Sequence, residues 1–484
     1  MRGRKSLFTV VAILLLLLVP LSCAVNPVTG KRELMLVTES DEVALGKQSD
    51  QGITRTYGIY DDQDLAGYID RLGQTISEVT QRSNLEYHFK VLDTPVVNAF
   101  AGPGGYVYVT RGILAYFDDE AELAGVLGHE LGHVNARHIA QQMSRQQLTQ
   151  LGLGVGMVYS ETFRKYADLA QFGAGMLFLK FSRDDERQAD NLAVEYASKS
   201  GYDARRMAAF FQTLERMSPG GGAGLPDWFS THPNPENRVA AVGAKAEEWR
   251  RTLGLAEYAV RRDDYLKMVD GIVYGDDPRQ GYVEGGAFYH PTMRFTLPVP
   301  AGWQLANTPA QVQILSDDKD AVILLMLDDS GSVSRAADRF VEDNGAAVQS
   351  RERLEVNGLQ AEKMVTRLVS DGDTLAAMSY FIAKDGSIYG LHGLTARSAY
   401  SKYSSAFSKT LGGFKNLEDA SKINVRPDRL TVRKAAREGT LAAILTQFGT
   451  PESELENVAI LNGMRLTDKV PAGALVKTIA RSAP

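Results

Sequence analysis

The sequence is poor in cysteine and histidine and has no excess of positive charge. Its 484 residues include one cysteine and 7 histidines, and the formal net charge is −6. A single cysteine excludes a disulfide bond within the chain. Proteins that bind nucleic acid usually carry a basic patch, and lysine and arginine form no dominant block in this sequence. We therefore expect no nucleic-acid partner.

Long hydrophobic runs are also scarce. The run at residues 7–19 follows three basic residues. An apolar core of about 7–15 residues behind positive charge is typical of a secretory signal, whereas a membrane span needs about 20 apolar residues. We assign residues 1–23 to a signal peptide, and the alternative is an uncleaved anchor helix. The later runs at 151–159 and 169–181 are short or interrupted, so we expect core helices there.

Cys23 lies just after the first hydrophobic run and resembles the processing site of a bacterial lipoprotein, where the cysteine is lipidated and becomes the first residue. Ser22 is suitably small for such a site, whereas Pro20 and Leu21 depart from the usual pattern. A lipidated cysteine can carry more than one acyl chain, and two chains anchor a protein stably. We predict an exported, periplasmic lipoprotein anchored to the outer membrane through Cys23. The alternative is export without lipidation.

The region after the signal peptide mixes helical and strand patterns. Apolar residues recur with helical period over residues 64–81, which predicts an amphipathic helix. Further helices are expected from Asp119 to Gln142, from Ser182 to Ser200 and from Asn234 onward, and strands at 87–91 and 106–110. The helix starts carry typical capping residues, namely Asp119 with Glu122 and Asn234 with Pro235.

The strongest motif is His129-Glu130-Leu131-Gly132-His133. Two histidines four residues apart on a helix project from one face. Both imidazoles can therefore reach one tetrahedral zinc ion at about 2.0–2.1 Å. Glu130 lies about 100° around the helix from His129, so it can contact a metal-bound water without binding the metal. We predict one zinc ion per chain; the alternative is a chance match, which is rare in a chain with 7 histidines.

A hydrolytic zinc site needs a third protein ligand and one open position. The metzincin pattern would place glycine at 136 and histidine at 139, and Ala136 and Ile139 exclude it. The remaining option is a carboxylate on a later helix, which Glu186 can provide. Asp190, one turn further, could accept a hydrogen bond from the free ring nitrogen of a ligating histidine. The alternative is an ordinary charged surface pair, because four other charged residues crowd positions 183–187.

Several motifs together resemble one family. They are Asn98-Ala99-Phe100-Ala101, Gly104-Gly105-Tyr106-Val107, the His129–His133 motif with Arg137-His138, the stretch from Glu186 to Asp190, and Thr231-His232-Pro233 with Arg238. This set resembles the HtpX and CAAX-prenyl-protease family of gluzincin zinc metallopeptidases over about residues 24–265. The segment 26–31 resembles its soluble periplasmic lipoprotein branch. The resemblance implies that Glu186 is the third zinc ligand and that the reaction is peptide-bond hydrolysis.

The predicted mechanism assigns roles to two further groups. Glu130 would take a proton from the zinc-bound water and pass it to the leaving amine. His232 could donate to the oxyanion of the tetrahedral intermediate or occupy the open metal position in a resting state; the alternative is a packing histidine. Arg238 could pair with Asp190 or lie in a surface salt bridge. His138 is about 140° around a continuous helix from His133, so we expect it to be structural or to support a ligand.

The strand at 106–110 is a candidate for substrate binding. An extended peptide could add to its edge by main-chain hydrogen bonds, which would make Tyr106, Val107, Tyr108 and Val109 substrate-binding residues. The alternative is an ordinary interior strand.

The C-terminal half carries less specific signals. Strands at 288–301, 311–316, 321–327 and 375–382 and helices near 336–341 and 400–411 predict an α+β accessory domain. The segment after about residue 428 contains Glu438-Gly439-Thr440-Leu441, Leu461-Asn462-Gly463 and Pro471-Ala472-Gly473. It weakly resembles a LysM module, a family whose members often bind peptidoglycan; the alternative is a small accessory domain that contacts the rest of the chain or a partner.

The predicted fold class is therefore α+β. A signal peptide (1–23) precedes a mainly helical zincin-type metallopeptidase domain with a small sheet (24–265), an α+β domain (280–418) and a LysM-like module (428–484). The preferred function is a zinc endopeptidase acting on misfolded or misassembled envelope proteins, a substrate class that the family resemblance implies. The alternatives are a non-catalytic chaperone or assembly factor with a latent metal site, and a cell-wall-binding lipoprotein.

Overall fold

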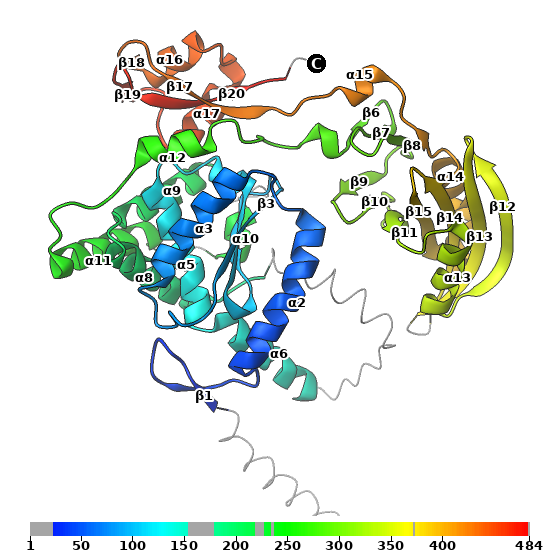
Figure 1. Ribbon diagram of the computed structural model, residues 1–484, viewed down its shortest axis with the longest axis horizontal. Helices are drawn as coiled ribbons and strands as arrows, with labels where there is room; N and C mark the ends of the chain where they lie inside the picture. The colour runs from blue at the N-terminus through cyan, green and yellow to red at the C-terminus, as the bar shows by residue number, and fades with distance from the viewer. Residues whose placement is uncertain (1–22, 153–178, 218–226, 234–236, 371–372, 483–484) are drawn as a thin grey trace, which may run out of the picture.

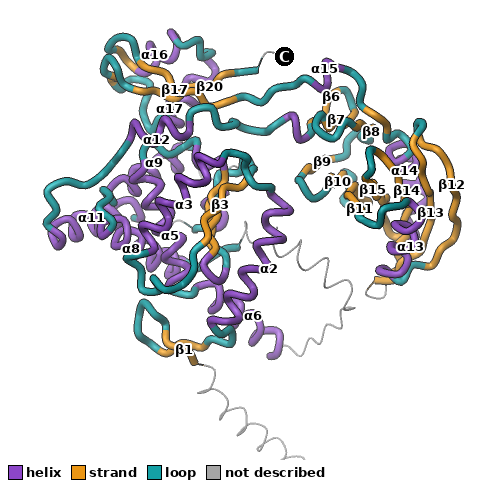
Figure 2. Tube along the Cα trace, viewed as in Figure 1, coloured by secondary structure: helices purple, strands orange, loops and turns teal. Residues whose placement is uncertain are grey.

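The structure is a computed structural model that describes residues 23–152, 179–217, 227–233, 237–370 and 373–482 (Figure 1). These residues form three units that follow one another along the chain. Helices dominate the first unit and strands the second, as Figure 2 shows. The structure thus confirms a chain of mixed helix and sheet. Residues 1–22 of the predicted signal peptide, most of the predicted core helices at 151–159 and 169–181, and the expected helix start at Asn234 lie outside the described residues.

The first unit surrounds a small sheet with helices. Its strands are β1 (Cys23–Val25), β2 (Arg32–Leu34), β3 (His88–Leu92), β4 (Ala99–Ala101) and β5 (Tyr106–Thr110). Its helices are α2 (Glu39–Tyr57), α3 (Gln63–Ser77), α4 (Arg111–Leu114), α5 (Glu120–Asn135), α6 (His138–Gly152), α8 (Arg183–Lys199), α9 (Arg205–Arg216), α10 (Asp227–Thr231), α11 (Arg238–Leu253) and α12 (Arg262–Val269). One continuous hydrophobic core joins the sheet to α3, α5, α8 and α9.

The three-stranded sheet has the order β3-β5-β4. β5 is parallel to β3 on one side and antiparallel to β4 on the other. All five β5 residues are buried. The prediction that Tyr106–Val109 offers a free edge to a peptide is therefore wrong, because both edges of β5 are already paired within the chain. The edge strand on this side of the sheet is β4.

Helix α5 is buried along its whole length. It begins as predicted, since the Asp119 side chain accepts from the Glu122 amide at 2.9 Å. The reciprocal bond differs from the predicted capping box, because Glu122 accepts from the amide of Asp118 instead. The predicted helix to Gln142 is also interrupted. Arg137 has a left-handed backbone, with φ of 58°, and this turn separates α5 from α6.

The second unit contains a seven-stranded antiparallel sheet of order β12-β13-β14-β15-β11-β10-β9. Its strands are β9 (Gln304–Asn307), β10 (Val312–Leu315), β11 (Ala321–Asp328), β12 (Ala347–Val356), β13 (Leu359–Ser370), β14 (Asp373–Lys384) and β15 (Ser387–Ala396). A smaller sheet contains β6 (Tyr282–Glu284), β7 (Ala287–His290), β8 (Phe295–Pro298) and β16 (Lys415–Asn416). The predicted strand at 288–301 is thus two strands, β7 and β8, joined by a turn.

Two helices cover opposite faces of the larger sheet. They are α13 (Val333–Asn344) and α14 (Tyr400–Leu411). Tyr380 packs in the cluster that contains Phe407 of α14, whereas its neighbour Phe381 packs with Ala337 of α13. Successive residues of a strand point to opposite faces, so each helix covers one face.

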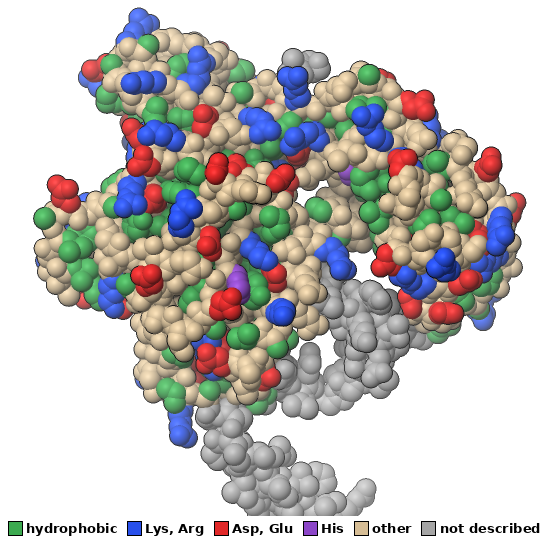
Figure 3. All heavy atoms as spheres, viewed as in Figure 1, with side chains coloured by type: hydrophobic (Ala, Val, Ile, Leu, Met, Phe, Trp, Pro, Cys, Tyr) green, Lys and Arg blue, Asp and Glu red, His purple; other side chains and the backbone are tan. Residues whose placement is uncertain are grey.

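An open gap separates the first and second units on the face shown in Figure 3.

The third unit packs directly on the first. It contains β17 (Arg429–Lys434) paired with β20 (Leu475–Ala480), β18 (Gly439–Thr440) paired with β19 (Lys469–Val470), and the helices α16 (Leu441–Gln447) and α17 (Leu455–Leu461). The short helix α15 (Ala420–Ile423) precedes it. Leu430 and Leu461 belong to the hydrophobic core of the first unit. Across the described ranges, we find no helix with the length and apolarity that a bilayer span requires.

Candidate metal centre

Four buried side chains converge inside the first unit. They are His129 and His133 of α5, Glu186 of α8 and His232, just after α10. Each is fully buried, and their ligand atoms all lie within 4.8 Å of one another. The structure thus brings together the three predicted metal ligands and adds His232 as a fourth donor.

The distances between the donor atoms suit a zinc ion. His129 Nε2 lies 3.1 Å from His133 Nε2 and 3.2 Å from His232 Nδ1. Glu186 Oε1 lies 3.0 Å from His232 Nδ1 and 3.4 Å from His133 Nε2. Donors about 2.0–2.1 Å from a zinc ion at the corners of a tetrahedron stand about 3.3 Å apart. The residues present therefore fit a tetrahedral site of three imidazoles and one carboxylate.

Glycines let α5 and α8 approach closely enough for this convergence. A Cβ atom on Gly132 would lie 3.0 Å from Ala189 Cα and 3.1 Å from its carbonyl oxygen, and one on Gly128 would lie 3.2 Å from Ala193 Cα. Both contacts are with the α8 backbone, which cannot rotate away as a side chain could. The absence of side chains at these two positions sets the separation between the helix that carries the histidines and the helix that carries Glu186.

Asp190 and Arg238 contact His129 and Glu186 outside the donor cluster. Asp190 Oδ1 lies 2.9 Å from His129 Nδ1, on the side of the ring opposite the cluster. Arg238 Nη2 donates to Asp190 at 2.7 Å and lies 3.2 Å from Glu186 Oε2, while its guanidinium stacks over the Phe211 ring. Both residues are nearly fully buried. The pairing of Arg238 with Asp190 that the sequence suggested is present.

For Glu186 and His133, the electrostatics favour the protonation states that metal ligands need. Burial raises the pKa of the Glu186 carboxyl, but the lowering by His232, His133 and His129 together is larger. The net pKa therefore lies well below its usual value. Burial lowers the pKa of His133 well below its usual value, although Glu186 opposes this shift. An ionised carboxylate and a neutral imidazole are the forms that bind a metal ion.

Glu130 lies beside the cluster and is not one of its donors. Its Oε1 is 3.7 Å from His232 Nε2, and the main chain of Ala101 in β4 also lies against the carboxyl. Burial raises the pKa of Glu130, with His232 and His129 opposing the shift. A carboxyl whose pKa lies closer to neutrality is better suited to accept and return a proton.

His232 stands at the fourth corner of the cluster. Trp228, one helical turn earlier, stacks on its ring at 4.2 Å between centroids, and Phe181 stacks on His133 at 3.9 Å. Burial lowers the pKa of His232, but the carboxylates of Glu186 and Glu130 raise it above its usual value overall. Sequence reasoning missed Phe181 and Trp228. The spacing of Trp228 to His232, four residues apart, was the one available signal.

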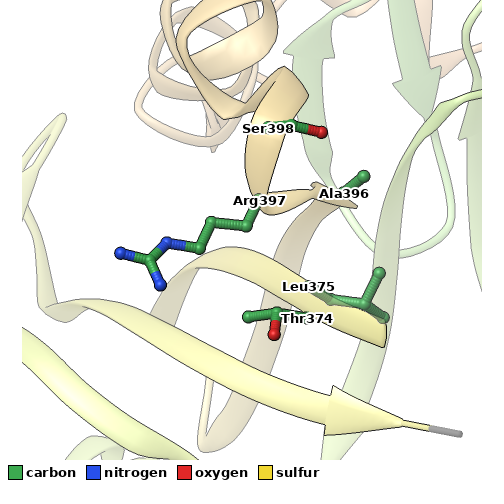
Figure 4. A pocket seen from close by; sticks show the side chains of 5 residues that line it. All are labelled: Thr374, Leu375, Ala396, Arg397 and Ser398. Atoms are coloured by element: carbon green, nitrogen blue, oxygen red, sulfur yellow. The ribbon is translucent and has the colours of Figure 1, made fainter. Parts of the chain in front are cut away.

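A surface hollow on the second unit is unrelated to this cluster. Thr374, Leu375, Ala396, Arg397 and Ser398 line it, where β14 begins and β15 ends (Figure 4). It contains one charged side chain and none of the metal donors.

Comparisons with known proteins agree with this geometry. Residues 63–246 match the model of Peptidase family M48. The beta-barrel assembly-enhancing protease of Yersinia pestis is 30% identical over 195 residues, which cover 38% of this chain and 40% of that protein. The mitochondrial metalloendopeptidase OMA1 of Arabidopsis thaliana is 32% identical over 154 residues, which cover 32% of this chain and 30% of that protein.

These matches cover only part of the chain and part of each relative. The chain spans 40% and 30% of the lengths of these two curated relatives. They support the broad peptidase family and not the narrower HtpX and CAAX-prenyl-protease branch that the motifs suggested. The matched segment contains all four members of the cluster. Residues 63–246 are therefore similar to Peptidase family M48.

Proposed function

We propose that the protein is a zinc-dependent metalloendopeptidase of the bacterial cell envelope. The observation that carries this proposal is the buried convergence of His129, His133 and Glu186 with Glu130 beside them. These three would hold one zinc ion per chain, with Asp190 and Arg238 fixing the ligands from behind. When bound, the ion would supply a Lewis acid and lower the pKa of a water toward about 7.

We assign the proton transfer to Glu130. It would take the proton of the attacking water and deliver it to the leaving amine. Its raised pKa and its place outside the donor set support that role. In the described arrangement His232 fills the fourth corner, so we propose that it is a ligand at rest. It would leave that corner during turnover and could then donate to the oxyanion.

We propose that the substrate binds along β4 rather than β5. The strand Ala99–Ala101 is at the edge of the sheet, and its last residue lies against Glu130. A peptide added to this edge by main-chain hydrogen bonds would pass close to the proposed base.

The substrate class and location rest on similarity. The name of the Yersinia pestis relative refers to assembly of β-barrels, and the chain's predicted export would place it in the cell envelope. We propose that misfolded or misassembled envelope proteins are the substrates, that the chain acts in protein quality control, and that Cys23 anchors it to the outer membrane. We retain 24–265, 280–418 and 428–484 as domain boundaries, with the last a LysM-like accessory module for which peptidoglycan is a weaker candidate partner.

One observation favours a second function. Because His232 occupies the fourth corner and the whole cluster is buried, the site could be latent and the chain a chaperone or assembly factor. Replacing Glu130 by Gln distinguishes an active peptidase from a protein with a latent metal site. For an active peptidase, the variant keeps one zinc ion per chain and loses cleavage of casein, while Glu248→Gln, at an exposed position of α11, keeps both.

The outcomes of this test separate the readings. A wild-type protein that binds zinc but cleaves neither casein nor an unfolded outer-membrane protein would favour the latent site. Equal cleavage by wild type and Glu130→Gln would remove Glu130 from the mechanism. Envelope proteins that accumulate on the Glu130→Gln variant in cells would identify the natural substrates.

A further inference from the structure

The turn between α5 and α6 contains an unusual backbone conformation. Arg137 has φ of 58°, a left-handed conformation that is unfavourable for any residue with a side chain. The Arg137 guanidinium is held in place, since Nε donates to Glu42 Oε2 at 2.8 Å and Nη2 donates to the Val37 carbonyl at 2.9 Å. Strained residues that the surroundings hold in place cluster at functional sites.

The turn brings His138 back against His133. On an uninterrupted helix, residue 138 would lie about 140° around the axis from residue 133. In the structure, His138 Nδ1 is 2.9 Å from His133 Nδ1, and the two ring centroids are 5.0 Å apart with the planes at 70°. Both rings are buried, with exposed fractions of 2% and 0%. His133 thus faces the donor cluster with its Nε2 and contacts His138 with its Nδ1.

The second nitrogen of His138 determines how this contact is hydrogen-bonded. His138 Nε2 lies 3.0 Å from Gln188 Oε1 and 3.7 Å from Asp185 Oδ1, and both oxygens are acceptors. The hydrogen of a neutral His138 therefore belongs on Nε2. Its Nδ1 is then a bare lone pair, which can only accept. At 2.9 Å the two facing Nδ1 atoms share one hydrogen, and His133 must supply it.

We propose that His138 is a positioning residue for the metal ligand His133. It accepts the Nδ1 hydrogen of His133, which leaves the Nε2 lone pair of that ring directed at the metal, and Gln188 fixes His138 in the tautomer that permits this. The inference rests on the proposed zinc site but not on peptide hydrolysis. His129 has a carboxylate, Asp190, in the corresponding place, so the two imidazoles are held by partners of different charge.

Two substitutions of His138 separate this role from packing. Partners that orient a metal-binding imidazole typically change metal affinity by about 10–100-fold when they are removed. His138→Phe keeps a buried ring but offers no acceptor, so the Zn2+ dissociation constant, measured by chelator competition on the full chain, should rise by about 10–100-fold. The side-chain oxygen of His138→Asn can take the place of Nδ1, and this variant should remain within about fivefold of wild type.

A spectroscopic measurement on the wild type completes the test. In the zinc-loaded protein, the imidazole 15N shifts of His138 should report a hydrogen on Nε2 and none on Nδ1. A hydrogen on His138 Nδ1 would overturn the proposal, and so would unchanged zinc affinity in a folded His138→Phe variant. If that variant fails to fold, the 15N shifts still decide. Tight zinc binding with the expected tautomer but no cleavage of casein would refute the proposed function and leave this inference standing.

Discussion

The Nζ of Lys477 donates to the main-chain carbonyl of Phe117 at 2.8 Å, although 360 residues separate the two. The same ammonium donates to the Ala115 carbonyl at 3.1 Å and lies 3.0 Å from Asp118 Oδ1. Lys477 is fully buried in β20. Its acceptors lie just before Asp119, the N-cap of α5, so a residue of the third unit holds the start of the helix that carries His129 and His133.

Replacing Lys477 by Met should destabilise the first and third units together. Met fills a similar volume but leaves two carbonyls and the buried Asp118 carboxylate without their cation. Removing one partner of a buried ion pair costs about 3–5 kcal/mol, so we expect a loss of about 3 kcal/mol in the free energy of unfolding. Urea titration measures this loss. Lys469→Met, at an exposed position of β19, is the control, and equal midpoints for the two variants would contradict the prediction.

Replacing Gly132 by Ala should weaken metal binding more than folding. The new methyl group would meet the α8 backbone at 3.0–3.1 Å and push Glu186 away from the imidazoles. Alanine stabilises a helix by up to about 1 kcal/mol relative to glycine, which offsets part of the steric cost. We expect zinc affinity to fall by about tenfold with little change in melting temperature. Gly243→Ala in α11, where a methyl group meets open space, should leave zinc affinity unchanged.

Asp190→Asn tests the support of His129. The amide preserves shape but removes the negative charge 2.9 Å from His129 Nδ1, so the imidazole becomes a weaker donor to a metal. Zinc affinity should fall by about 10–100-fold, as measured by chelator competition. Asp184→Asn, on the exposed side of the same helix, serves as the matched control. A wild-type dissociation constant in Asp190→Asn would show that the contact does not assist metal binding.

The second unit should lose stability in mild acid because of His392. Burial lowers the pKa of His392 to about 4, whereas the unfolded chain titrates near about 6.5. Between these values the unfolded state binds the additional proton, so stability is fully present above about pH 6.5 and is lost as the pH falls toward 4. The total change is about 3 kcal/mol. His290, whose pKa burial also lowers to about 4, acts in the same direction.

Hydrogen exchange of the amides in β14 and β15, measured at several pH values, would follow this loss within the second unit itself. His392→Leu should flatten the pH dependence without abolishing it, because His290 remains. If the slope of the variant equals that of wild type, His392 is not the group that titrates.

Local features of the sequence were predictable because they depend on residues close together in the chain. The bounds of β5 and α14 agree with the expected segments at 106–110 and 400–411, and the Asp119 cap is where its side chain predicts. The convergence of His129, His133 and Glu186 could be anticipated only with the family resemblance, since spacing alone left Glu186 open.

Features set by long-range pairing could not be read from the sequence. Nothing near Tyr106 indicates that β3 and β4 occupy both of its edges. The left-handed turn at Arg137 depends on Glu42 and Val37, about a hundred residues earlier. The long strand β12 escaped prediction because most of its residues are exposed and several are charged. In β13 the buried face includes the polar residues Glu362 and Thr366, which hides the apolar alternation.

The shared core of the first and third units affects the order in which the chain can fold during synthesis. The ribosome makes Leu430, Leu461 and Lys477 long after the metal-binding helix, so a nascent or truncated chain has the zinc motif without the support at its start. On the proposed function, hydrolytic capacity would then arise only after residues 430–477 have been made and have packed against the first unit.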